Sequence, residues 1–194
     1  MAGTVPHHST YVILHHPKPP AEYPPKIDKG FSPLYRRLLL SATQRGGVVN
    51  FGWQGSFTEG KTRESADSNV GEEYSASIFS SRLREQRIEL PEVSLSNLSN
   101  IEEILDDPVK YTDAIAAGTR DKPEVHLYVC THGSRDCRCG DMGGRLVDAL
   151  RSELGIRQRR SRDQQNQGEG EGKGGLDVWD RVQIGELAHV GGHK

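Results

Sequence analysis

The sequence predicts an α/β fold, and the order of its segments is the main reason. Residues 10–16 are β-branched and apolar, Leu34, Leu38 and Leu39 follow at helical spacing, and residues 48–53 are again β-rich. A strand, a helix and a strand in this order imply two parallel strands joined by a crossover. A second β-rich segment, residues 124–130, precedes another helical pattern. The alternation therefore recurs in the second half of the chain.

Each element of the first half has a local signal. A proline-rich stretch follows residues 10–16 and is expected to end that strand. Ser32 and Pro33 are typical of a helix N-cap and first turn, and the glycine pair at 46–47 is expected to end the helix. The polar residues from about 55 to 73 show no period, which predicts a mobile loop.

The second half begins after a moderately helical pattern over residues 98–118. Residues 124–130 alternate as a strand does, which leaves Cys130 at the strand exit. We expect two units, an N-terminal α/β domain over residues 1–118 and a second domain over residues 122–194.

Three further elements are expected in the second unit. Apolar residues at helical spacing predict a helix over residues 145–154, ended by Gly155. The low complexity of residues 157–175 predicts a flexible insertion. A short strand within residues 178–187 is then expected to deliver the chain to His189.

Composition excludes several classes of protein. The formal net charge of -2 gives no basic footprint, so we expect no nucleic-acid partner. Only three cysteines occur, all within ten residues, which is a poor disulfide framework and favours a reducing compartment. No apolar run could span a bilayer, and the N-terminal segment lacks a signal-peptide core. These features predict a cytoplasmic protein without a membrane partner.

Two segments carry the chemistry. The first is Val-Cys-Thr-His-Gly-Ser-Arg-Asp-Cys-Arg-Cys-Gly at residues 129–140, and the second is His-Val-Gly-Gly-His-Lys at the end of the chain. Cys130 and Cys139 bracket eight residues, and His189 and His193 bracket three. Two thiolates and two imidazoles suit zinc or iron–sulfur chemistry and suit calcium or magnesium badly. The four residues are therefore candidate ligands of one metal centre.

These segments resemble the sucrase/ferredoxin-like family of thioredoxin-like 2Fe-2S ferredoxins, which includes the actin-patches-distal and altered-inheritance-of-mitochondria proteins. The N-terminal segment Tyr-Val-Ile-Leu-His-His-Pro also resembles the first domain of that family. The resemblance implies a thioredoxin-like ferredoxin domain preceded by a smaller α/β domain. It also implies a 2Fe-2S cluster with Cys130 and Cys139 on one iron and His189 and His193 on the other.

The resemblance sets the expected function. Neutral imidazoles in place of two thiolates remove negative charge, which makes reduction of a cluster easier. We expect an electron carrier rather than a substrate-converting enzyme, with a reductase or electron acceptor as its redox partner protein, and proton uptake at His189 or His193 coupled to electron transfer. Family members continue beyond the second histidine, so a chain ending at Lys194 is expected to have a truncated C-terminus. The family resemblance also allows a mitochondrial location.

Two alternatives remain open at this stage. The three-residue gap between the histidines is also permitted in zinc fingers, so a zinc-stabilised binding module is the first. The second is a thiol-disulfide redox protein that uses Cys137 and Cys139. Between the two candidate cysteine ligands, His132 is predicted to be a loop residue that hydrogen-bonds near the site, and Arg138 to be a charge that shapes the loop. His15, near the N-terminus, is predicted to be a surface residue.

Overall fold

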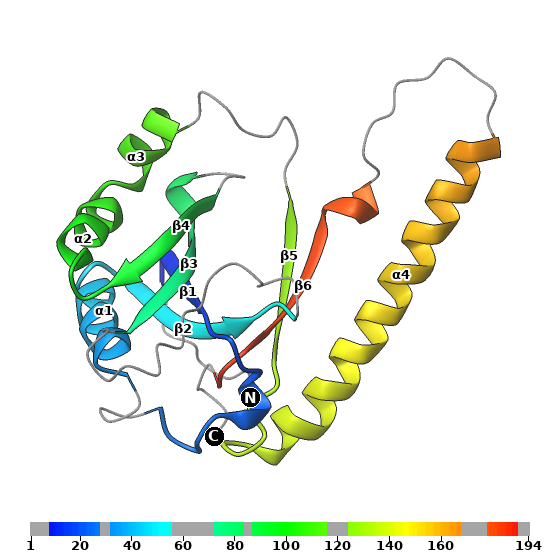
Figure 1. The fold of residues 1–194 in the computed structure, drawn as a ribbon, viewed down its shortest axis with the longest axis horizontal. Coiled ribbons are helices and arrows are strands. Elements are labelled where there is room, and N and C mark those ends of the chain that lie inside the picture. Colours follow the sequence, from blue (N-terminus) through cyan, green and yellow to red (C-terminus); the bar gives the residue numbers. More distant parts are fainter. Residues whose placement is uncertain are drawn as a thin grey trace.

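The structure, a computed structural model, confirms the α/β fold: a six-stranded mixed sheet with helices packed outside it (Figure 1). It describes residues 8–27, 32–55, 72–83, 87–115, 124–167 and 178–189.

The strands are β1 (Thr10–His15), β2 (Gly47–Trp53), β3 (Glu73–Ser80), β4 (Arg87–Ser94), β5 (Val125–Cys130) and β6 (Val182–Leu187). Their order across the sheet is β4-β3-β1-β2-β6-β5. The pair β1–β2 is parallel, as the predicted crossover requires, β5–β6 is also parallel, and the other three pairs are antiparallel.

The two halves of the chain meet within this sheet. β2 pairs with β6 through Gly52 opposite Leu187 and Trp53 opposite Glu186. The strands expected in two separate units thus form one hydrogen-bonded surface. The division into residues 1–118 and 122–194 and the thioredoxin-like architecture of the second part stay predictions.

The helices are α1 (Pro33–Gln44), α2 (Leu98–Asp106), α3 (Pro108–Ile115) and α4 (Gly144–Gln167). The predicted cap of α1 is confirmed, because the Tyr35 amide donates to Ser32 Oγ at 2.9 Å. The chain leaves α1 through Gly46, which has a φ of 70° that favours glycine. Figure 1 shows α1, α2 and α3 grouped together, whereas α4 runs separately beside β6.

The apolar core lies between one face of the sheet and the first helices. Leu34 and Leu38 of α1 and Ile101 of α2 are buried against residues of β1 and β2 such as Leu14 and Phe51. Burial of such side chains contributes about 1.5–3 kcal/mol each. This face fixes the N-terminal part of the sheet.

The opposite face of the sheet combines charged and polar side chains with aromatic ones, since Phe79 and Tyr128 lie against His126. Arg87 of β4 forms an ion pair with Glu124, just before β5, and its guanidinium lies 2.6 Å from His126 Nε2. The two edge strands therefore approach each other across this face. His15 also lies on it, buried and 2.8 Å from Ser77 Oγ, so the prediction of a surface position for His15 was wrong.

Helix α4 corrects a second prediction. It continues through Gly155 to Gln167, so the expected helix end was wrong, and the described part of the expected insertion, up to residue 167, is helical. A glycine inside a helix costs only about 1 kcal/mol. Packing offsets this cost, because the Arg157 guanidinium lies 4.5 Å from the Trp179 ring centroid and Gln158 donates to the Trp179 carbonyl at 3.1 Å.

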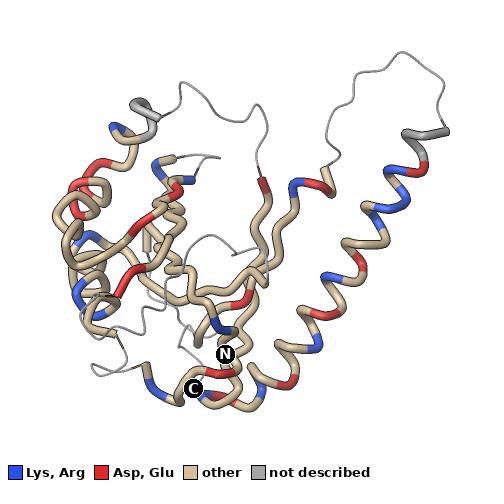
Figure 2. The backbone as a smooth tube through the Cα atoms, viewed as in Figure 1, with Lys and Arg blue, Asp and Glu red and all other residues tan. Residues whose placement is uncertain are grey.

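Two strands had no prediction from the sequence, and parts of two predicted segments lie outside the residues that the structure describes. β3 and β4 had no sequence-based prediction, and Glu73, placed in the expected loop, begins β3. The rest of that loop, residues 56–71, and residues 168–177 of the expected insertion fall outside the described residues. Among the helices that are described, none combines the length and apolar composition needed to cross a bilayer. Basic and acidic residues instead alternate along α4 (Figure 2).

Candidate metal centre

Two neighbouring parallel strands carry the first candidate ligands to one edge of the sheet. Cys130 is the last residue of β5 and lies opposite Leu187, the last residue of β6. The ladder continues one step further, because the Thr131 amide donates to the Leu187 carbonyl at 3.2 Å. His189 follows Leu187 by two residues and therefore leaves the sheet beside Cys130.

A tight loop and a π-helical turn return the chain to the same edge. The turn spans Cys139–Gly143 and leads directly into α4. The amides of Cys139 and Gly140 both donate to the Asp136 carbonyl, at 3.0 and 3.2 Å. A Cβ on Gly140 would lie 2.7 Å from the Cα of Gly133, so the loop closes on itself only with glycine there. Single π-turns of this kind often occur at functional sites.

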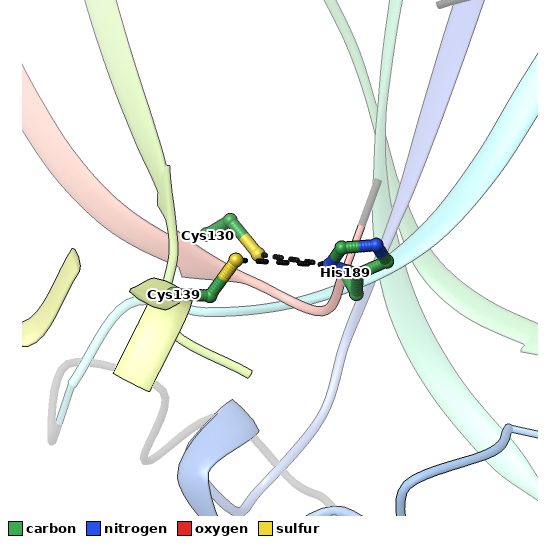
Figure 3. Close-up of side chains that lie close together, drawn as sticks. All are labelled: Cys130, Cys139 and His189. Carbon is green, nitrogen blue, oxygen red and sulfur yellow. Dashed lines mark hydrogen bonds between the residues drawn. The ribbon is translucent and has the colours of Figure 1, made fainter. Parts of the chain in front are cut away.

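Three of the four predicted ligands meet at this point (Figure 3). His189 Nδ1 lies 3.7 Å from Cys139 Sγ and 4.0 Å from Cys130 Sγ. All three ligand atoms lie within 4.8 Å of one another. Cys139 is buried, and Cys130 and His189 are half-buried. His193, the fourth predicted ligand, lies outside the described residues.

The electrostatics of the site keep the Cys139 thiol protonated at neutral pH when no cation is bound. Burial, followed by the neighbouring Cys130, raises the pKa of the Cys139 thiol to about 12. Two anionic sulfurs at this separation repel each other strongly in a partly desolvated place. A metal ion bound here would displace the thiol protons, and its positive charge would offset the repulsion between the two thiolates.

The loop also holds residues that the sequence assigned correctly to supporting roles. His132 is buried, and its Nδ1 accepts from the His189 amide at 3.2 Å, which confirms the expected hydrogen bond near the site. Arg138 donates to both carboxylate oxygens of Asp136, at 3.0 and 2.7 Å, and this pairing holds the Asp136 pKa well below its usual range. The third cysteine, Cys137, is exposed.

One supporting network has no signal in the sequence. Thr131 Oγ1 donates to Glu186 Oε2 at 2.8 Å, and Arg151 of α4 pairs with the other oxygen of Glu186 at 3.1 Å. Glu186 is buried although it is a charged residue. It lies in a strand whose other inward positions are apolar. The network links β6, the residue after Cys130 and α4. Only the fold brings these three elements together, so sequence spacing could not reveal it.

Comparison with known families gives a match over the whole chain, residues 1–194, to the family described as Sucrase/ferredoxin-like. Comparisons with curated proteins and with solved structures find no match.

Proposed function

We propose a function from one premise: the chain belongs to the Sucrase/ferredoxin-like family, because the family match covers residues 1–194. We infer that the chain binds a 2Fe-2S cluster and transfers single electrons to or from a redox partner protein. The observation that carries this proposal is the convergence of Cys130, Cys139 and His189 within 4.8 Å.

The donor set fits such a cluster. Thiolate sulfur and imidazole nitrogen are the ligand types that iron–sulfur centres use, whereas hard cations prefer oxygen. His193 would supply the remaining ligand from the segment after His189. With two imidazoles among its ligands, a 2Fe-2S cluster supplies an electron acceptor of raised potential, as in Rieske centres at roughly −150 to +300 mV against about −400 mV for plant-type ferredoxins.

The chain itself contributes burial and orientation. Cys139 is buried at the start of the π-helical turn, which limits contact of its sulfur with water. Cys130 is fixed by the β5–β6 ladder, and His189 presents Nδ1 toward both sulfurs. Ligands that are held rigidly move little when the cluster gains or loses an electron, so the energy of rearrangement stays small. Coupling of proton uptake to electron transfer stays a prediction.

The distances favour a second candidate, a single zinc ion. Zn–S bonds of about 2.3 Å and Zn–N bonds of about 2.0–2.1 Å at a tetrahedral angle place sulfur and nitrogen about 3.6 Å apart. The separations of 3.7 and 4.0 Å between His189 Nδ1 and the two sulfurs are close to this value. A zinc ion held in this way would stabilise the fold and carry no electron.

The thiol-disulfide alternative has less support. Cys137 is exposed and Cys139 is buried, so their thiols lie on different sides of the helical segment. Residues two positions apart on a helix do not face each other. A disulfide between them would require the turn at Cys139 to unwind.

Metal and sulfide analysis separates these candidates. The chain is purified without oxygen, and iron, zinc and acid-labile sulfide are measured per chain together with the visible spectrum. The proposal expects equal amounts of iron and labile sulfide, a red-brown colour that bleaches on reduction, and a paramagnetic signal in the reduced state. A colourless protein with one zinc ion per chain would establish the second candidate instead. Metal-free protein with a reversible disulfide would overturn both.

A further inference from the structure

The peptide unit between Ala188 and His189 is held on both of its polar groups. Asn50 of β2 donates from Nδ2 to the Ala188 carbonyl at 3.1 Å. The His189 amide donates to His132 Nδ1 at 3.2 Å. Asn50 and His132 are 4% and 2% exposed, so water cannot easily replace either side chain. A peptide is planar, so fixing both groups fixes the peptide plane and the position of the His189 Cα, and only φ and the side-chain torsions of His189 remain to set its direction.

His132 is itself held by the N-terminal half of the chain. Its Nε2 lies 2.9 Å from the Pro24 carbonyl, and a carbonyl oxygen only accepts hydrogen bonds. Nε2 must therefore carry the proton while Nδ1 accepts from the His189 amide. These two partners together select the neutral Nε2–H tautomer. The ring is a bridge between Pro24 and His189.

The Pro24 carbonyl is a well-defined anchor for local reasons. The proline ring fixes φ of Pro24, and the following Pro25 restricts its ψ to the extended region. Ser134, two residues after His132, strengthens the attachment, because its Oγ donates to the Tyr23 carbonyl at 2.6 Å. The proline-rich connector after β1 thus supports the loop that carries both cysteines.

We propose that Asn50 and His132 are positioning residues that clamp the Ala188–His189 peptide and so set the His189 imidazole against the sulfurs of Cys130 and Cys139. The inference rests on the proposed metal site but holds for iron or zinc alike. Without the clamp, His189 remains in the chain but no longer points its Nδ1 at the two thiols. Groups that support metal ligands commonly change metal affinity by 10- to 100-fold.

Three substitutions separate the parts of the clamp. His132→Asn keeps an acceptor at the position of Nδ1 and loses the bond to Pro24. His132→Gln keeps a donor at the position of Nε2 and leaves the His189 amide without its acceptor. Asn50→Asp has nearly the same shape but loses the Nδ2 donor to the Ala188 carbonyl and to the Tyr11 hydroxyl. Ser134→Ala is the matched control, since it removes a bond from the same loop to the same connector without touching His189.

The test uses Co²⁺ titration of the metal-free full chain, read by the visible spectrum, which reports sulfur and nitrogen ligation. We expect His132→Gln and Asn50→Asp to bind Co²⁺ at least about tenfold more weakly and to show the spectrum of His189→Ala. We expect His132→Asn and Ser134→Ala to keep the wild-type spectrum. A purely structural role would lower stability without producing the His189→Ala spectrum. Wild-type affinity and spectrum in both His132→Gln and Asn50→Asp would overturn the proposal.

A second measurement keeps the clamp testable if the chain binds no Co²⁺. That result would exclude a site for a single ion but not a cluster site, and the clamp would then be judged by NMR of the metal-free protein. The ¹⁵N shifts of His132 are expected to show a protonated Nε2 and an unprotonated Nδ1, and the His189 amide is expected to exchange slowly. A rapidly exchanging His189 amide, or the opposite tautomer, would overturn the clamp by itself.

Discussion

The backbone of Cys130 occupies the space beside Gly143 that any larger residue would need. A Cβ on Gly143 would lie 2.1 Å from the Cys130 carbonyl oxygen, whereas a Cβ on Gly144 would meet nothing within 4 Å. The end of β5 and the π-helical turn thus touch through a glycine. This contact holds the two candidate cysteine ligands near each other.

Gly143→Ala is expected to push the turn away from β5. Overpacking of this kind lowers the free energy of unfolding by about 1–3 kcal/mol, and here it also separates Cys130 from Cys139. Chemical denaturation and Co²⁺ titration measure the two effects. Gly144→Ala is the matched control and should leave both unchanged or slightly improved, since alanine favours a helix start over glycine. Equal behaviour of the two variants would show that the close contact is absent in solution.

The three cysteines are expected to differ sharply in their contribution to metal content. Cys130→Ser and Cys139→Ser remove a sulfur that faces His189 Nδ1, so each should lose most of the bound metal. Cys137→Ser removes an exposed thiol, and this variant should retain the bound metal. Metal per chain and the visible spectrum after identical purification provide the comparison. Full metal content in Cys139→Ser would exclude Cys139 as a ligand.

The Glu186 network is expected to contribute more than an ordinary surface pair. Glu186→Gln removes the charge that Arg151 faces at 3.1 Å in a largely buried place, so we expect the free energy of unfolding to fall by about 1–3 kcal/mol. Glu153→Gln removes the exposed pair with Arg157 on the same helix and should cost about 0.5 kcal/mol or less. Urea denaturation of both variants tests this difference. Similar losses in both would mean that burial adds nothing to the Glu186 pair.

His126, on the face of the sheet opposite the apolar core, is expected to make stability depend on pH. Burial, followed by the positive charge of Arg87, lowers the pKa of His126 below its ordinary value of 6.5, although Glu124 and Glu89 act in the opposite direction. The folded chain therefore holds His126 neutral. Its contribution to stability is present above the unfolded pKa and is lost as the pH falls below 6.5 toward the folded pKa.

His126→Gln should remove this part of the pH dependence. The free energy of unfolding of the wild type, minus that of the variant, is expected to shrink between pH 7 and pH 5. His15, which also has a lowered pKa, is present in both proteins, so the part of its shift that burial causes cancels in the difference. Denaturant titrations at several pH values give the two curves. Curves that stay parallel over this range would contradict the prediction.

The N-cap of α1 offers a simple check on the fold. Ser32 Oγ accepts from the Tyr35 amide and donates to Glu72 at 3.0 Å, so it joins α1 to the residue before β3. Ser32→Ala is expected to lower the free energy of unfolding by about 1 kcal/mol. Thermal or urea denaturation measures the loss. An unchanged stability would indicate that the cap is replaced by water.

Local signals in the sequence determined the elements whose causes are local. Ser32 and Pro33 set the start of α1, β-branched runs set β1 and β5, and the parallel pairing of β1 with β2 followed from the crossover. The candidate ligands Cys130, Cys139 and His189 were also found from spacing and residue type. These features depend on neighbours within a few residues or on the chemistry of single side chains.

Only the tertiary structure decided the features that join distant segments. Beyond Gly155, α4 packs against Trp179; His15 is buried beside Ser77; and the position of His189 depends on Asn50 and His132. No local pattern marks such residues, because each gains its role from a partner brought near by folding. The sequence thus determined which atoms can bind a metal, and the packing of one continuous sheet decided that three of them meet.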